Sequence, residues 1–315
     1  MNLENVEQSP TAKLPNTWDV IDRIGSTLQL LDHELSDMLQ LSDREFEKFR
    51  STKKNLPMTK VFSLAERLDL GFSSIATGKI DYQALSQHYF GNKEFLPERY
   101  ATAALGRRRT TLCVLNYIEE MFGWQERLNV LRHFQLNETL FANIDANINF
   151  LFASDLCDYL FRYRLSESAL SQIGIQTFQS INFSKARKEL GDCNSVAELY
   201  EKMCLDFAPK HLEQNFIYKF SRTGPTRCLL SATPNPILEE AFKSKIIGNP
   251  ATSFLRLGVV ASFSTLFGLP PADVKHVSSI YQGDSEILYE IDFSLAHSVF
   301  EQRKRRGIGH PLFSN

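Results

Sequence analysis

Apolar residues recur at helical spacing through the first half of the chain. The predicted stripes lie at residues 21–31, 61–68, 112–122 and 125–134. Apolar positions three and four residues apart fall on one face of a helix, and Gly123 marks the end of the third stripe. Strand-like alternation is nearly absent up to residue 161. The pattern therefore predicts an all-helical first half.

The pattern changes from about residue 179 onward. Two β-rich runs, 215–222 and 227–233, flank the turn "TGP", and this arrangement predicts a hairpin. Further elements are expected as helices at 236–247 and 251–268 and as strands at 277–280 and 285–293. Helices mixed with hairpin strands predict an α+β second half with an antiparallel sheet.

The composition is that of an ordinary soluble globular protein. The 315 residues are 43% hydrophobic and 23% charged, and this length allows roughly two domains. The formal net charge of −2 means that any nucleic-acid contact must come from a local basic patch. The polar N-terminal segment lacks the features of a secretory signal, and no apolar run approaches the roughly 20 residues of a membrane span. We therefore expect a cytoplasmic protein with no membrane partner.

The residues that carry chemistry in enzymes form no recognisable motif. The cysteines are Cys113, Cys157, Cys193, Cys204 and Cys228. Their scatter and the lack of a CxxC spacing argue against a zinc site or a disulfide framework and favour buried free thiols. GxSxG, P-loop, GxGxxG and HExxH motifs are absent. We expect no catalytic residue, no bound metal and no enzyme activity.

One stretch near the N-terminus alternates short helices with polar turns. A helix is predicted at 34–40, and Ser42 or Asp43 caps a second helix that ends near residue 49. The basic loop "RSTKKN" and a longer helix at 58–68 follow. Two short helices with a tight turn are the ingredients of a helix-turn-helix, whose second helix enters the major groove of DNA.

The stretch "LSDMLQLSDREFEKFRSTKKNLPMTKVFSLAERLDL" resembles the Cro/phage-repressor family, and the resemblance covers about residues 20–80. It implies that a two-fold dimer recognises an operator. Arg44 and Lys48 lie one turn apart on the second helix and are the candidates for base contacts. The candidates for phosphate contacts are Arg50, Ser51, Thr52, Lys53 and Lys54.

An alternative remains open for the same helices. Asp43, Glu45 and Glu47 stand on the second helix, where carboxylates would repel phosphates. The segment could instead be a docking or dimerisation bundle that does not bind DNA. Two further basic clusters, residues 107–109 and 303–306, are either solvated surface or an added attraction for phosphate.

The C-terminal segment "LGVVASFSTLFGLPPADVKHVSSIYQGDSEILYEIDF" carries a second resemblance. It is similar to the end of the sensory domains related to the four-vinyl-reductase and heme–nitric-oxide-binding folds. The matching residues are His276, Gly283, Asp284, Tyr289, Glu290 and Ile291. The resemblance covers about residues 180–295 and implies an apolar pocket under a sheet for a small molecule, or a dimer surface.

The residues that could line this pocket are Phe216, Tyr218, Phe220, Phe254, Leu257, Val260 and Phe263. Any of them could equally be plain core. Serines and an isoleucine occupy the region where metal-binding members of the family have cysteines, and no Tyr-x-Ser-x-Arg setting is recognisable. We therefore expect no cofactor, and we interpret His276 as a hydrogen-bonded structural residue and not as a ligand.

These patterns predict a ligand-responsive, DNA-binding transcriptional regulator that is a homodimer. The expected divisions are a flexible tail (1–17), a helix-turn-helix domain (18–85), a helical connector and dimerisation region (86–178), an α+β ligand-sensing domain (179–300) and a basic tail (301–315). The expected partners are operator DNA and a small apolar ligand. The alternative is a signalling protein whose N-terminal bundle docks onto another protein.

Overall fold

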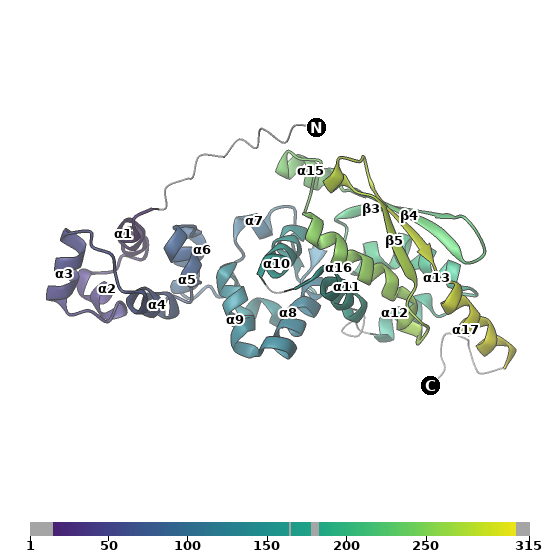
Figure 1. The fold of residues 1–315 in the computed structure, drawn as a ribbon, viewed down its shortest axis with the longest axis horizontal. Helices are drawn as coiled ribbons and strands as arrows, with labels where there is room; N and C mark the ends of the chain where they lie inside the picture. The colour runs from purple at the N-terminus through teal and green to yellow at the C-terminus, as the bar shows by residue number, and fades with distance from the viewer. Residues whose placement is uncertain (1–14, 164, 178–182, 307–315) are drawn as a thin grey trace, which may run out of the picture. The chain divides into compact units, whose positions relative to one another are not determined.

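The computed structural model describes residues 15–163, 165–177 and 183–306 (Figure 1). The chain forms two compact units. Unit 1 contains the described residues up to Pro97 together with Trp124–Leu140, and unit 2 contains Glu98–Gly123 and the described residues from Phe141 onward. The expected connector at 86–178 is therefore divided between the two units. Most of the expected N-terminal tail lies outside the described residues, as does the end of the basic tail.

Unit 1 is helical, as predicted. Its helices are α1 (Thr17–Leu28), α2 (Asp32–Met38), α3 (Asp43–Ser51), α4 (Met58–Arg67), α5 (Phe72–Thr77), α6 (Tyr82–Tyr89) and α9 (Trp124–His133), and the short η1 (Glu138–Ala142) begins in it. The apolar stripe of α1 is buried from Ile21 to Leu28, whereas Leu31 lies beyond the end of the helix and is 60% exposed.

Trp18 joins α1 to α3 in the core of unit 1. Its indole N–H donates a hydrogen bond of 2.9 Å to the carbonyl oxygen of Lys54. Its ring meets the buried ring of Phe46 edge-on, with centroids 5.5 Å apart. A buried indole needs such a partner for its N–H. These interactions anchor α3 and the loop that follows it to the body of the unit.

The start of α3 has the predicted cap. The hydroxyl of Ser42 accepts a hydrogen bond from the amide of Glu45, and the Glu45 carboxylate in turn accepts one from the amide of Ser42. Gln40, in the connection before it, has a φ of 53°. The two short helices and their turn thus form as the sequence indicates.

Replacing Ser42 with alanine should lower the free energy of unfolding of unit 1 by about 1 kcal/mol, because the first turn of α3 loses its cap. Both tryptophans, Trp18 and Trp124, lie in unit 1. Urea denaturation followed by tryptophan fluorescence therefore measures this unit. Ser51→Ala is the matched control, since that hydroxyl bonds only within its own helix. Equal urea midpoints for the two variants would contradict the capping assignment.

Unit 2 holds the other helices and the strands of the described residues. Its helices are α7 (Glu98–Ala101), α8 (Arg109–Phe122), α10 (Phe150–Tyr163), α11 (Glu167–Gln176), α12 (Phe183–Leu190), α13 (Val196–Lys202), α14 (Ala208–His211), α15 (Pro236–Phe242), α16 (Pro250–Ala261) and α17 (Ser294–Arg305). The shorter turns are η3 (Met203–Phe207), η4 (Ser262–Phe267) and η5 (Ile280–Gln282). A pair of two-residue strands, β1 (Gly106–Arg107) and β2 (Asn147–Ile148), lies apart from the main sheet.

The main sheet is antiparallel with the order β3-β4-β6-β5, which confirms the predicted α+β class. Its strands are β3 (Phe216–Arg222), β4 (Arg227–Pro234), β5 (Asp273–Ser278) and β6 (Ile287–Asp292). The predicted hairpin is β3 and β4, paired from Phe216↔Pro234 to Arg222↔Cys228. Alternate residues of β6, from Ile287 to Ile291, are fully buried. One face of the sheet thus closes the core of the unit.

Three predicted elements differ from the structure. The strand expected at 277–280 is β5, which begins directly after the Pro-Pro break and is interrupted by a bulge between His276 and Ser278. The helix expected at 236–247 ends at Phe242, because Lys243 adopts a left-handed conformation. The helix expected at 251–268 changes into the tighter η4 at Ser262.

α11 and α16 lie side by side with their backbones in contact (Figure 1). Two glycines allow this approach. A Cβ atom added to Gly174 would lie 2.1 Å from the carbonyl oxygen of Leu255, and one added to Gly258 would lie 1.8 Å from that of Ser171. No larger residue fits at either position without separating the helices.

Some residues of the two basic clusters, 107–109 and 303–306, interact with other parts of unit 2. Arg109 pairs with Asp145, and Arg107 donates to the carbonyl oxygen of the same residue. Arg303 belongs to α17 and donates to the carbonyl oxygens of Phe267 and Gly268, which satisfies the end of η4. The first part of the expected basic tail is therefore the end of α17, in which Arg303 packs on the body of the unit and Lys304, Arg305 and Arg306 are exposed. Among the described helices none is long and apolar enough to cross a bilayer.

Candidate functional site

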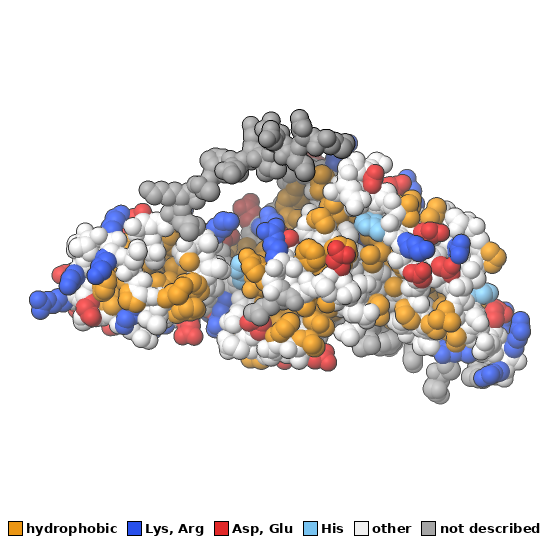
Figure 2. Space-filling model, viewed as in Figure 1, with side chains coloured by type: hydrophobic (Ala, Val, Ile, Leu, Met, Phe, Trp, Pro, Cys, Tyr) orange, Lys and Arg blue, Asp and Glu red, His pale blue; other side chains and the backbone are white. Residues whose placement is uncertain are grey.

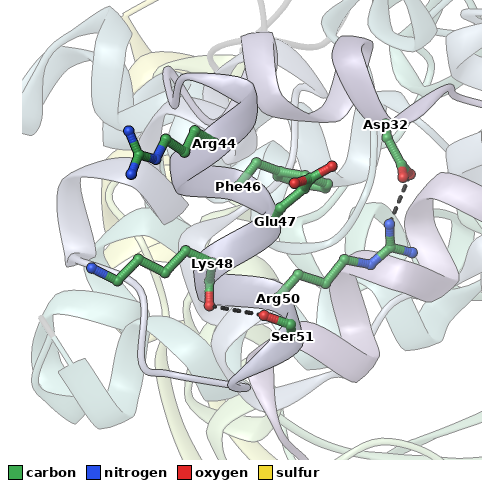
Figure 3. Close-up of a pocket in the computed structure, with 7 residues that line it drawn as sticks. All are labelled: Asp32, Arg44, Phe46, Glu47, Lys48, Arg50 and Ser51. Carbon is green, nitrogen blue, oxygen red and sulfur yellow. Dashed lines mark hydrogen bonds and ion pairs between the residues drawn. The ribbon is translucent and has the colours of Figure 1, made fainter.

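The first candidate site is the exposed face of α3. The helix borders an open depression of about 690 Å³ lined by Asp32, Arg44, Phe46, Glu47, Lys48, Arg50 and Ser51 (Figure 3). Arg44 and Lys48, the candidates for base contacts, are exposed and extend away from the helix on the same side. Figure 2 shows lysine and arginine side chains over this end of unit 1. The face can offer two cations one helical turn apart.

Two of the three acidic residues of α3 are held by hydrogen bonds within unit 1. The carboxylate of Asp43 accepts a hydrogen bond of 2.8 Å from the hydroxyl of Ser36 on α2. Glu45 is held by the cap, and the hydrogen bonds from Ser42 lower the pKa of its carboxyl. Glu47 alone of the three acidic residues lines the depression beside Arg44 and Lys48.

The residues expected to contact phosphate are held by internal interactions. Arg50 pairs with Asp22 at 2.9 Å and with Asp32 at 2.7 Å, and Lys53 pairs with Asp19 at 2.5 Å.

The other three of these residues also interact within the unit. The hydroxyls of Ser51 and Thr52 donate to the carbonyl oxygen of Lys48. The Lys54 ammonium lies 6.0 Å from the centroid of the Phe49 ring. A phosphate would have to compete with these interactions, most of all at Arg50.

The second candidate site is a cavity of about 110 Å³ in unit 2. Three of the residues expected in a ligand pocket, Tyr218, Val260 and Phe263, line it. Further lining residues, which the sequence did not single out, are Thr110, Phe150, Ala153, Thr177, Cys204, Ala208, Leu212, Glu213, Asn215, Leu230, Thr252, Leu255, Arg256 and Val259. The cavity is bounded by β3, α16 and the π-helical turn η3. A π-helical turn of this kind is common at functional sites.

Four of the predicted pocket residues lie elsewhere. Phe216 is buried beneath the Arg256 guanidinium, and Phe220 and Leu257 pack against the core of the unit. Phe254 packs against Phe161 on α10, with ring centroids 5.8 Å apart. Their apolar character reflects core packing, which was the other interpretation of the same pattern.

Arg256 is the cationic residue of the cavity wall, and sequence reasoning missed it. Its guanidinium lies 3.7 Å from the centroid of the Phe216 ring. Its Nη2 donates a hydrogen bond of 3.0 Å to the hydroxyl oxygen of Tyr218, and that hydroxyl donates to Glu213. A signal was present in the sequence, because Arg256 is the one charged residue of the twelve in α16.

The residues that carry the C-terminal resemblance have structural roles. His276 on β5 stacks on Tyr289 of β6 with centroids 5.3 Å apart, and burial together with the charge of Arg256 lowers its pKa. Its Nε2 is buried without a hydrogen-bond partner in the described chain. Gly283 adopts a φ of 97°, and Asp284 accepts a hydrogen bond from the amide of Ser279. The Gly-Asp pair therefore shapes a turn.

The described residues offer no ready metal site or reactive thiol. No group of three or more His, Cys, Asp or Glu side chains in this part of the chain is placed to hold a metal ion. All five cysteines are buried, as predicted. Burial raises the pKa of Cys113 to about 11 and that of Cys228 to about 12, so these thiols stay protonated near neutral pH.

No protein-family model and no curated protein sequence matches this chain. The resemblance of residues 20–80 to the Cro/phage-repressor family therefore gains no support from these comparisons.

Comparison with solved structures finds weak similarities. An H-NOX protein from S. oneidensis in the Fe(II)NO state has a TM-score of 0.44 and 10% identity, over 60% of this chain and 99% of that one. An unliganded Fe(II) H-NOX protein from K. algicida has a TM-score of 0.43 and 11% identity, over 59% and 95%. A trafficking protein particle complex subunit 3 from Naegleria fowleri, covalently bound to palmitic acid, has 0.34 and 13%, over 45% and 90%. Similarities at this level carry no argument about function.

Proposed function

We propose that this protein is a ligand-responsive, DNA-binding transcriptional regulator. Unit 1 binds operator DNA through α3, and the cavity in unit 2 takes a small, largely apolar molecule. The protein acts in the cytoplasm as a homodimer, so that two copies of α3 meet two half-sites. It performs no catalysis. Ligand binding shifts the population between two dimer geometries and thereby changes the affinity for the operator.

The observation that carries this proposal is the charge arrangement on α3. Arg44 and Lys48 are exposed and have no ion pair within the described residues, whereas Asp43 and Glu45 are held by Ser36 and Ser42. Both carboxylates keep their charge, but they are held in the first turn of α3, and Glu47 is the acidic residue of α3 that lines the depression beside the two cations. A charged or amide side chain on such a helix can bind a base edge, and each good bidentate pair discriminates by about 1–3 kcal/mol.

The test is a fluorescence-anisotropy titration of the purified chain with DNA fragments from upstream of its own gene. We expect the Arg44→Ala/Lys48→Ala double variant to bind at least about tenfold more weakly. The slope of log affinity against log salt should fall by about 0.9 for each phosphate that the variant no longer neutralises. The control is Arg67→Ala/Lys79→Ala, which removes the same charge from exposed positions of unit 1 outside α3. Selective binding that is equal in both double variants would contradict the assignment to α3.

A docking or dimerisation module is the second candidate for unit 1. Met58 and Phe62, one turn apart on α4, are 64% and 48% exposed, and Phe62 stacks on Phe72 at 4.3 Å. An exposed apolar pair of this kind suits a protein partner. Association through it should respond weakly to salt, in contrast to DNA binding. Salt-insensitive self-association without DNA binding would favour this candidate.

A further inference from the structure

The wall of the cavity in unit 2 includes polar side chains. Arg256 and Asn215 both line it. The Nη1 atom of Arg256 and the Oδ1 atom of Asn215 are shielded from solvent and have no hydrogen-bond partner in the described chain. Buried polar groups in proteins are nearly always paired. Oδ1 of Asn215 needs a donor and Nη1 of Arg256 needs an acceptor, so the charged atom, Nη1, indicates a missing acceptor.

The unpaired guanidinium nitrogen sets the chemistry of that partner. An arginine stays protonated in proteins and offers only donors, so its partner must supply an acceptor oxygen. The Phe216 ring beneath Arg256 and the Tyr218 hydroxyl beside it hold the guanidinium in place. A preorganised guanidinium binds carboxylates better than neutral oxygens, because the hydrogen bond is assisted by charge.

Glu213 supplies the negative charge among the residues that line the cavity. Its two carboxylate oxygens accept hydrogen bonds from the Tyr218 hydroxyl and from the backbone amide of Asn215. The Tyr218 hydroxyl thus bridges Glu213 and Arg256. The Glu213 carboxylate therefore acts on Nη2 of Arg256 through the Tyr218 hydroxyl. Nη1 of Arg256 is left for another acceptor.

The other lining residues set the size and the apolar character of a ligand that the cavity can hold. Apolar side chains such as Leu230, Leu255 and Val260 surround a space of about 110 Å³. An apolar cavity of about 150 Å³ is known to hold one benzene molecule. The space here therefore suits a molecule of about four carbon atoms.

We propose that the ligand of this cavity is a short-chain monocarboxylate whose carboxylate binds Nη1 of Arg256. This inference rests on the proposed function, because it specifies the small molecule that unit 2 takes up. It replaces a purely apolar ligand with an amphiphilic one.

The test uses the full chain and isothermal titration calorimetry with butyrate and butyramide, which have nearly the same shape and differ in charge. We expect butyrate to bind at least about tenfold more tightly than butyramide. Arg256→Gln should abolish this difference, because the charge that favours the carboxylate over the amide is gone. Hexanoate should bind more weakly than butyrate, because the cavity is too small for its chain.

The outcomes separate the inference from the function on which it rests. Equal affinities of butyrate and butyramide for the wild-type chain would overturn the inference without any variant, so it stays testable if Arg256→Gln fails to fold. Tighter butyrate binding that survives in Arg256→Gln would also overturn it. If neither compound binds, the inference fails while the titration with DNA still decides whether the protein is a regulator.

Discussion

Alanine in place of Gly258 is expected to lower the free energy of unfolding of unit 2 by about 3–5 kcal/mol. The added Cβ would lie 1.8 Å from the carbonyl oxygen of Ser171 and 2.8 Å from the amide nitrogen of Ile175. Both atoms belong to the backbone of α11, so no side chain can rotate away and the helices must separate. Overpacking usually costs about 1–3 kcal/mol, and a clash with backbone belongs to the upper end of that range or beyond it.

Thiol accessibility measures this effect, because all five cysteines are buried in unit 2. The variant should expose them to a thiol reagent at lower urea than the wild type does. Gly224→Ala is the matched control, since a Cβ there meets nothing closer than 3.9 Å. Gly174→Ala should lower the free energy of unfolding less in the Gly258→Ala background than in the wild-type chain, because there the helices are already apart. A Gly258→Ala variant with the urea midpoint of the Gly224→Ala control would refute the close packing of α11 and α16.

Glu138→Ala should destabilise unit 1 by about 2–3 kcal/mol, which is the second large effect we expect. Arg127 on α9 is 4% exposed, and its Nε and Nη2 donate to both carboxylate oxygens of Glu138 at 3.0 and 2.6 Å. Removing one partner leaves a buried cation without its bidentate acceptor, which typically costs about 3–5 kcal/mol. The side chain of Glu138 is 29% exposed, so solvent reduces the loss.

Tryptophan fluorescence reports on this change directly, since the Arg127 guanidinium lies 5.6 Å from the centroid of the Trp124 ring. The control is Asp19→Ala, which breaks an ion pair with Lys53 in which both side chains are more than half exposed. Such surface pairs contribute about 0–1 kcal/mol. Two variants of equal stability would mean that the pair with Glu138 contributes no more than a surface pair does.

Local signals explain which parts of the fold were predictable. The cap at Ser42, the helix end at Gly123 and the hairpin turn before Arg227 each depend on neighbouring residues only. The membership of α9 in unit 1 depends on distant partners. The side chain of Arg132 pairs with Asp69 at 2.6 Å, and its carbonyl oxygen accepts a hydrogen bond from the amide of Gly71. No periodicity indicates interactions between segments so far apart in the sequence.

The candidate sites follow the same rule: features set by neighbouring residues could be predicted, and features set by distant segments could not. The position of Arg44 and Lys48 follows from helical spacing, whereas the pairs of Arg50 and Lys53 come from aspartates on α1 and α2. In the cavity, apolar character indicated Tyr218 but not Arg256. Arg256 carries a charge, yet in the fold its guanidinium packs on the Phe216 ring.

The order in which the two units alternate along the chain has a consequence for biosynthesis. Unit 1 needs Trp124–Leu140, yet Glu98–Gly123 of unit 2 are made first. At about 5–20 residues per second, translation takes several seconds to pass from Pro97 to Leu140. Until translation has passed His133, α5 is complete but α9, whose backbone later packs on Gly71, is not. A nascent chain paused between Pro97 and Leu140 would present an unfinished unit 1 to chaperones. The speed of translation across α8 would set how long unit 1 stays unfinished.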